Sequence, residues 1–76
     1  MNEKYLKVFI DTFNVSAEQA NSIAYQSIPD WDSVGHMQLI TMIEATFNVT
    51  LSAEDIIDFS SFEKGKEILE KYGVEF

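Results

Sequence analysis

The residues that could do chemistry lie together in the short segment 30–36. Ser33 supplies a hydroxyl, His36 is the chain's single histidine, and Asp30 and Asp32 supply carboxylates. These residue types suggest three kinds of site: a calcium loop, a serine hydrolase centre, or a serine that accepts a covalent group. Each kind requires a different spacing, so the sequence can be compared with all three.

A calcium site of the EF-hand type fits the segment only in part. Asp30, Asp32 and Gly35 stand at positions 1, 3 and 6 of that pattern. Position 5 is Val34 and position 12 is Thr41, so a carboxylate and the bidentate glutamate are missing. We therefore expect no metal site in this segment.

A hydrolase would use His36 to activate Ser33, and residues with this spacing can be neighbours on a helix. However, Trp31 occupies the place of the first glycine of a nucleophile elbow. A chain of 76 residues also leaves little room for a substrate pocket with an oxyanion hole. We expect no catalytic residue, and we expect His36 to be a solvated surface side chain.

Covalent attachment at Ser33 agrees better with the surrounding sequence. A phosphodiester on a serine at a helix N-terminus meets free backbone N–H groups and the positive end of the helix dipole. The chain has no cysteine, so any thiol chemistry must be imported. The helical period predicts that the apolar face beginning with Val34 turns toward the core while Ser33 faces outward.

The element that positions Ser33 is a predicted helix over residues 33–47. Asp32 is a good N-cap and Asn48 can end the helix. The apolar positions cover a wide face, and Glu44 is the helix's one charged side chain when His36 is neutral. Such a helix is packed by several neighbours, so we expect it to be the most central one.

Two elements precede this helix. Residues 3–13 have the apolar spacing of one buried helix face, at Leu6, Phe9, Ile10 and Phe13, and Asn14 can end that helix. Residues 14–32 form a long connection, in which Ser16 and Gln19 make a capping box for a short helical turn. Val15, Ile23, Tyr25, Ile28 and Trp31 are its expected apolar anchors.

Two further helices are predicted after it. Ser52 caps a short third helix, and Ser60 with Glu63 forms a capping box that opens the last one. Gly65, inside that last helix, permits close helix contact. The sequence therefore predicts a single domain over 1–76 of the all-α class: an antiparallel four-helix bundle with three longer helices and a short third one.

Composition limits the possible partners. Thirteen acidic residues against five basic ones give a net charge of -8, which repels nucleic acid and anionic lipid. We expect protein partners with basic patches, no nucleic-acid or membrane partner, and a monomer. The sequence lacks the apolar run of a signal peptide or a membrane span, so the expected location is the cytoplasm.

The segment Asp32-Ser33-Val34, followed by Leu39, Ile43 and Phe47, resembles the Asp-Ser-Leu signature and second helix of acyl carrier proteins. Chain length, acidity, absent cysteine, the long first loop, the short third helix and the turn over 47–51 are also similar to that family. The resemblance covers essentially the whole chain.

This resemblance implies that Ser33 receives a 4'-phosphopantetheine arm from coenzyme A, transferred by a phosphopantetheinyl transferase, with Asp32 as the preceding acid of the motif. The terminal thiol of the arm carries acyl or aminoacyl groups as thioesters. The protein would be a carrier and not an enzyme, serving the acyl-activating and acyl-transferring enzymes of a specialised lipid, polyketide or related pathway.

The resemblance also implies a surface that partner enzymes contact. Val34 replaces the usual leucine, and Gly35 and Gln38 stand where fatty-acid carriers present acids, so the acidic patch is shifted to the short third helix. The expected partner-facing residues are Val34, Met37, Glu44, Glu54, Asp55 and Asp58.

Two further expectations complete this interpretation. Bound acyl chains would enter between helices lined by Met37, Ile40, Ile57 and Phe59, although most such residues are ordinary core at this spacing. The alternative function is an acidic helical protein-protein interaction module without a prosthetic group, in which Ser33 only caps a helix.

Overall fold

The computed structural model describes residues 3–76, which fold into five helices without a β-strand among them. The helices are α1 (Glu3–Phe13), α2 (Ala17–Ala20), α3 (Ser33–Phe47), α4 (Ala53–Asp58) and α5 (Phe62–Glu70). The described chain is therefore mostly helical, as predicted. No helix within these residues combines the length and apolar character that crossing a bilayer requires.

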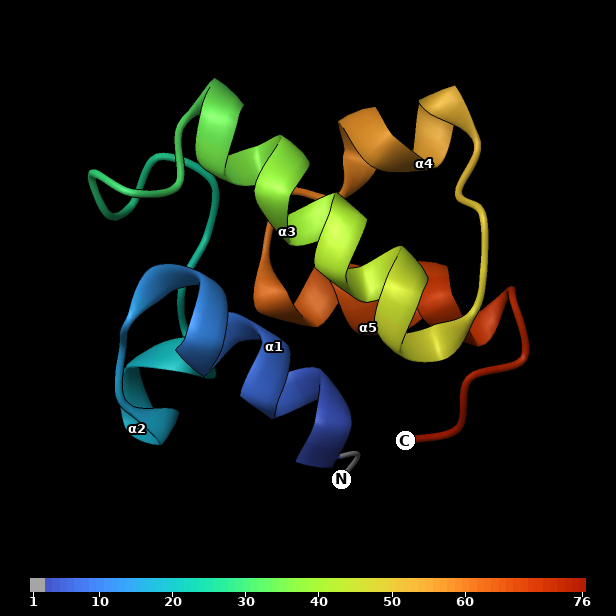
Figure 1. Ribbon diagram of the computed structural model, residues 1–76, viewed down its shortest axis with the longest axis horizontal. Coiled ribbons are helices and arrows are strands. Elements are labelled where there is room, and N and C mark those ends of the chain that lie inside the picture. The colour runs from blue at the N-terminus through green and yellow to red at the C-terminus, as the bar shows by residue number, and fades with distance from the viewer. Residues whose placement is uncertain (1–2) are drawn as a thin grey trace.

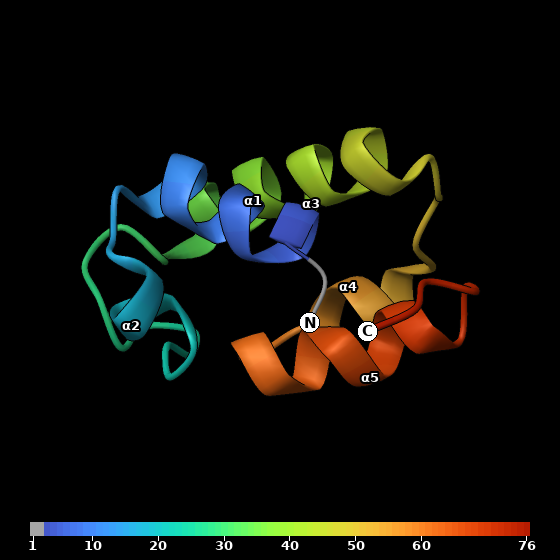
Figure 2. The ribbon, with the colours of Figure 1, turned by 90° about the horizontal axis from the view of Figure 1, so that it is seen from below.

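The helices are arranged in two layers (Figures 1 and 2). α1 and α3 lie side by side and run in opposite directions, and they make the most extensive helix-to-helix contact. α4 and α5 form the layer below them in Figure 2, and α2 contacts α1 at one end of the molecule. α2 is the short helical turn predicted after Ser16.

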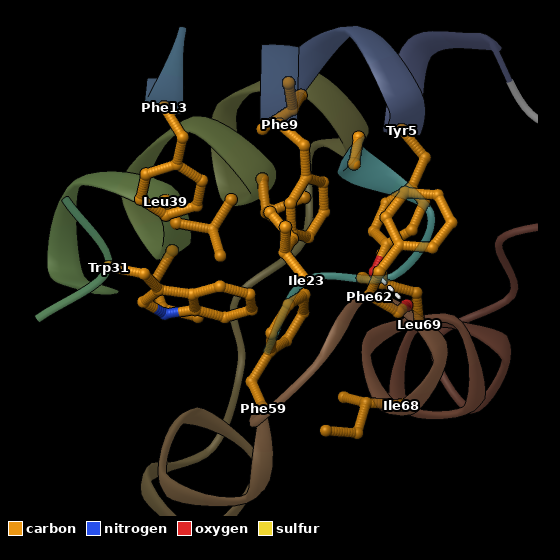
Figure 3. Close-up of a cluster of buried hydrophobic side chains, with 14 of the residues drawn as sticks. Tyr5, Phe9, Phe13, Ile23, Trp31, Leu39, Phe59, Phe62, Ile68 and Leu69 are labelled. Carbon is orange, nitrogen blue, oxygen red and sulfur yellow. Dashed lines mark hydrogen bonds between the residues drawn. The ribbon is translucent and has the colours of Figure 1, made fainter. Parts of the chain in front are cut away.

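The core between the layers is rich in aromatic side chains (Figure 3). Phe9 of α1 lies at its centre, with ring centroids 5.7 Å from Trp31 and 5.0 Å from Phe62. The buried residues of α1 are Tyr5, Val8, Phe9 and Phe13. Two predicted members of that face, Leu6 and Ile10, are only half-buried, because the helix turns its row of aromatic residues inward.

Most predicted helix ends are confirmed. Asn14 and Asn48 both have φ of 54°, the left-handed conformation that ends α1 and α3. Ser16 accepts a hydrogen bond from the Gln19 amide at 3.2 Å, and the Gln19 side chain accepts from the Ser16 amide at 3.0 Å. Ser52 caps α4 as predicted.

The predicted start of the last helix was wrong by one residue. Ser61, not Ser60, is the N-cap of α5, and its hydroxyl accepts from the Lys64 amide at 3.0 Å. The carbonyl of Ser60 instead accepts from the Tyr25 amide at 2.8 Å. This long-range backbone contact fixes the residue before the helix, and a local capping pattern cannot reveal it.

Gly65 does allow close contact within the core. A Cβ at this position would overlap the Tyr5 hydroxyl and the Phe59 ring. The Tyr5 hydroxyl donates a hydrogen bond of 2.6 Å to the Phe62 carbonyl, which ties α1 to the first turn of α5. Burial raises the pKa of Tyr5, and the charge of Glu63 raises it further, so the phenol stays a donor.

Candidate functional site

Ser33 is the first residue of α3, and its side chain is exposed. Asp32 is the N-cap, and its carboxylate Oδ1 accepts a hydrogen bond of 2.9 Å from the Gly35 amide. The amides of Ser33 and Val34, at the first two helical positions, have no partner within the helix. The start of α3 therefore presents a hydroxyl beside backbone donors.

Ser33 differs from the other serines at helix starts in this protein. The hydroxyls of Ser16, Ser52 and Ser61 each accept from the amide three residues on and so cap α2, α4 and α5. At α3 the carboxylate of Asp32 does this, which leaves the Ser33 hydroxyl unused for capping. Its neighbour is the Tyr25 hydroxyl at 3.4 Å, where either oxygen can donate.

Gly35 lets the preceding loop pass close to α3. A Cβ at Gly35 would overlap the carbonyl oxygen of Asp30. Any side chain larger than hydrogen at this position would therefore not fit here. The loop that leads into Ser33 therefore lies against the first turn of the helix.

Trp31 anchors this loop, as predicted, and is fully buried. Its ring stacks on Phe13 with centroids 5.2 Å apart, and its indole N–H donates to Nδ1 of His36 at 3.0 Å. The other ring nitrogen of His36 lies 2.7 Å from the carbonyl oxygen of Ile56 in α4. The loop, α3 and α4 are thus joined through one imidazole.

The expectation that His36 is a solvated surface residue was wrong. His36 is half-buried, and because Nδ1 accepts from Trp31, the proton must be on Nε2, which donates to Ile56. Neither ring nitrogen is free to accept a proton from Ser33. The site can present the serine hydroxyl, but this histidine does not activate it.

An apolar groove begins at Ser33 and runs between α1 and α3. It has a volume of about 800 Å³, and we call it the α1–α3 groove. Its lining residues are Asp11, Thr12, Ser33, Val34, Met37, Gln38, Thr41 and Met42.

The side chain of Val34 is 67% exposed, so the expectation that it turns toward the core was wrong. The buried positions of α3 begin at Gly35 and continue at Leu39, Ile40 and Ile43.

Of the four residues expected to line a path for an acyl chain, Ile57 and Phe59 line one pocket, Met37 lines the α1–α3 groove, and Ile40 lines neither. Ile40 and Phe59 are both buried in the core, and Phe59 also forms a wall of the pocket that Ile57 lines. Met37 is half exposed and lines the α1–α3 groove, whereas Ile57, 78% exposed, lines a separate pocket of about 240 Å³ beside Tyr25 and His36. Met37 and the pair Ile57 and Phe59 therefore line two different cavities.

The acidic residues expected to contact partners fall into two groups. Glu54 and Asp58 are exposed on α4. Glu44 is half-buried, and its carboxylate accepts from the Leu51 amide at 3.0 Å, so it holds the turn after α3.

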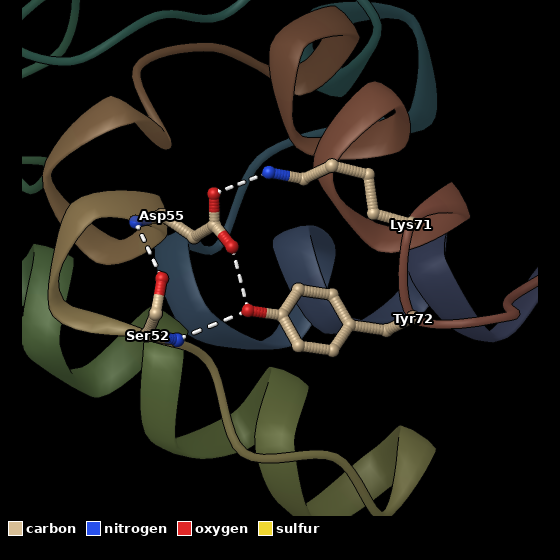
Figure 4. A network of polar contacts seen from close by, with 4 residues as sticks. All are labelled: Ser52, Asp55, Lys71 and Tyr72. Atoms are coloured by element: carbon tan, nitrogen blue, oxygen red, sulfur yellow. Dashed lines mark hydrogen bonds and ion pairs between the residues drawn. The ribbon is translucent and has the colours of Figure 1, made fainter.

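Asp55 is buried and bonded within the protein, unlike the exposed Glu54 and Asp58 of the same helix (Figure 4). Its carboxylate is buried between the Lys71 ammonium and the Tyr72 hydroxyl, each 2.6 Å away. The hydrogen bonds from Lys71 and Tyr72 lower the pKa of Asp55 and so favour its charged form. Expecting Asp55 on the partner surface was wrong, because it ties α4 to the C-terminal segment.

Within residues 3–76, no group of three His, Cys, Asp or Glu side chains is placed to hold a metal ion. Comparison with protein-family models, curated proteins and solved structures found no match for this chain. The geometry around Ser33 is therefore the basis for a functional assignment.

Proposed function

We propose that this protein is an acyl carrier, modified at Ser33 with 4'-phosphopantetheine and acting as a substrate-bearing partner of biosynthetic enzymes. In the modification, the Ser33 oxygen forms a bond to phosphorus, the nucleotide part of coenzyme A leaves, and the hydroxyl proton is released. The thiol of the arm then holds acyl or aminoacyl groups as thioesters. The observation that carries the proposal is the exposed Ser33 hydroxyl, released from capping by Asp32.

The residues around Ser33 fit such a group. The hydroxyl is exposed at the start of α3, where the helix dipole and free amides favour a phosphodiester. No lysine or arginine belongs to α3 or to the loop before it; the chain's lysines are Lys4, Lys7, Lys64, Lys66 and Lys71, and it has no arginine. Backbone donors at the helix start are thus the main favourable partners for the phosphate.

The carrier role also implies a helix arrangement, a set of partners and an oligomeric state for this protein. α1, α3, α4 and α5 correspond to the four helices of a carrier bundle, with α2 as a turn in the long loop. The partners are a phosphopantetheinyl transferase and acyl-transferring enzymes with basic patches, which contact exposed Val34, Met37, Glu54 and Asp58. The protein works as a monomer in the cytoplasm.

A second candidate function is an interaction module without a prosthetic group. The exposed apolar side chains of Val34, Met37 and Met42 favour it, because such a surface can bind a partner directly. This candidate predicts that Ser33 is never modified and that partner binding survives Ser33→Ala.

Intact mass spectrometry after incubation with coenzyme A and a broad-specificity phosphopantetheinyl transferase tests the carrier proposal. We expect the wild type and the control Ser16→Ala to gain the mass of one phosphopantetheine group and Ser33→Ala to gain none. Ser16 is a suitable control because it is also an exposed serine at a helix start. An unmodified wild type, or an equal gain in Ser33→Ala, would contradict the proposal.

A further inference from the structure

Tyr25 places a phenol hydroxyl beside Ser33 from the loop that precedes α3. The two side-chain oxygens lie 3.4 Å apart. Hydroxyl pairs that form a good hydrogen bond lie about 2.7–2.8 Å apart, so this contact is weak in the unmodified protein. The Tyr25 side chain is 37% exposed, and the sequence predicted it only as an apolar anchor of the loop. Its hydroxyl therefore has a position beside the proposed attachment point and little to bond there.

The backbone at Tyr25 is held by the segment between α4 and α5. The Tyr25 amide donates to the Ser60 carbonyl at 2.8 Å, and the Phe62 amide donates to the Ile23 carbonyl at 3.1 Å. This part of the loop is thus paired with a distant part of the chain. The phenol keeps its place without help from Ser33.

The ring of Tyr25 is held from the side of α3. It packs edge-on against His36, with ring centroids 5.6 Å apart. His36 is itself fixed, since one ring nitrogen accepts from Trp31 and the other lies 2.7 Å from the Ile56 carbonyl. A donor on a ring that is already fixed loses little conformational freedom when it binds a ligand.

Modification of Ser33 changes what the Tyr25 hydroxyl can bond. In a phosphodiester the Ser33 oxygen carries no proton, so of the two side chains only Tyr25 can donate. The charged phosphate oxygens lie one bond beyond the Ser33 oxygen, and rotation about the bond to phosphorus can turn one of them toward the phenol. A hydroxyl comes to about 2.5–2.7 Å from a charged oxygen, and this bond is roughly twice as strong as a neutral one.

We infer that the Tyr25 hydroxyl binds the phosphodiester on Ser33, donating a hydrogen bond to one of its oxygens and so fixing the first atoms of the 4'-phosphopantetheine arm. The inference rests on the proposed function. Asp30 and Asp32 carry the same sign of charge as the phosphate, and no lysine or arginine belongs to α3 or its preceding loop. The phenol therefore adds a side-chain donor to the backbone amides at the start of α3.

Thermal unfolding of the unmodified and the modified protein tests this inference. Tyr25→Phe keeps the ring and removes only the hydroxyl. We expect the unmodified variant to unfold near the wild-type temperature, because the bond that it loses is long. The modified variant should unfold about 4 °C or more below the modified wild type, since it loses a bond to a charged group. A loss in the modified form that is no larger than in the unmodified form would overturn the inference.

A full-length chain synthesised with phosphoserine in place of Ser33 tests the bond without a transferase. Phosphoserine loses its second proton at a pKa of about 6, and a donor to the charged form lowers that pKa. In a phosphorus NMR titration, Tyr25→Phe should raise the phosphoserine pKa by about 0.4–1, the equivalent of one hydrogen bond. A pKa that stays the same or falls would overturn the inference.

Tyr72→Phe is the matched control for both measurements. It also removes a phenol hydroxyl, but one that donates to Asp55 and joins α4 to the C-terminal segment. It should lower the unfolding temperature of the unmodified and modified forms alike and leave the phosphoserine pKa unchanged. If Tyr72→Phe raised that pKa as much as Tyr25→Phe, a general loosening of the fold would explain the shift, and the inference would be overturned.

The two experiments separate this inference from the carrier function. If the transferase leaves Ser33 unmodified while Tyr25→Phe raises the phosphoserine pKa, the carrier function fails and the bond from Tyr25 to a phosphate on Ser33 stands. If Ser33 is modified and Tyr25→Phe lowers the stability of both forms equally, the role of Tyr25 fails and the carrier function stands.

Discussion

The capping role of Asp32 can be tested by two substitutions that separate its hydrogen bond from its charge. Asp32 accepts from the Gly35 amide at 2.9 Å through Oδ1. In Asp32→Asn the amide oxygen can accept the same bond, since Asn and Asp are equally good N-caps. In Asp32→Ala the Gly35 amide loses its partner, and replacing an N-cap by alanine typically costs about 1 kcal/mol.

The charge of Asp32 adds a second, salt-dependent contribution. A carboxylate at a helix N-terminus is worth about 0.3–1 kcal/mol at low ionic strength, and salt screens it. For a domain of this size, 1 kcal/mol corresponds to roughly 4–8 °C in the unfolding midpoint. At high salt we therefore expect Asp32→Asn to unfold near the wild-type temperature and Asp32→Ala to unfold about 4–8 °C lower.

Calorimetric unfolding at neutral pH, at low and at high salt, measures both contributions. Asp30→Ala is the matched control, because Asp30 is an exposed acid in the same loop and its side chain caps no helix. Its midpoint should stay near that of the wild type. If Asp32→Asn and Asp32→Ala lowered the unfolding midpoint equally at high salt, the result would refute the conclusion that the Asp32 hydrogen bond, and not its charge, organises the start of α3.

Three other predictions concern the core and the polar network. Gly65→Ala should lower stability by about 1–3 kcal/mol despite its higher helix propensity, because the new Cβ overlaps the Phe59 ring; chemical denaturation measures the loss. Tyr5→Phe should cost about 0.5–1.5 kcal/mol in the same assay, since it removes the buried hydrogen bond between α1 and the Phe62 carbonyl. Asp55→Asn should be less stable than the wild type at neutral pH. Folding lowers the pKa of the Asp55 carboxyl, so its charged form stabilises the folded protein at pH values above its ordinary pKa of 3.8. This stabilisation is lost as the pH falls through the pKa that Asp55 has in the folded protein. The unfolding midpoints of the wild type and Asp55→Asn should therefore converge in acid. Each of these predictions has its own contrary result. A gain in stability would contradict the first for Gly65→Ala, and an unchanged stability would contradict the second for Tyr5→Phe. The third would be contradicted if the stability difference between Asp55→Asn and the wild type did not change with pH.

The sequence predicted the features that depend on near neighbours in the chain. The left-handed ends at Asn14 and Asn48 and the capping box at Ser16 are decided within a few residues, so their patterns are visible before folding. The bounds of α1 and α3 were predicted for the same reason. The start of α5 was wrong because the Ser60 carbonyl pairs with the distant Tyr25 amide.

The site was predictable only in part, because long-range contacts decide several of its side chains. Ser33 at the start of α3 could be found from its neighbours. By contrast, His36 bonds to Ile56, twenty residues away, and Asp55 pairs with Lys71, sixteen residues away. A charge pattern shows that such residues are polar, but only the packed structure shows that their polar atoms are already bonded.

The same long-range contacts explain why Ser33 stands out among the helix-start serines. A serine at the N-cap position accepts a hydrogen bond from the amide three residues on, as Ser52 does for α4. Before α3 the loop is fixed by buried Trp31 and by the close approach of the Asp30 carbonyl to Gly35. This fixed backbone places Asp32, and not the serine, at the N-cap. The Ser33 hydroxyl is therefore exposed because the core holds the loop before it, and a substitution that loosens the loop should affect access to Ser33 without touching the serine itself.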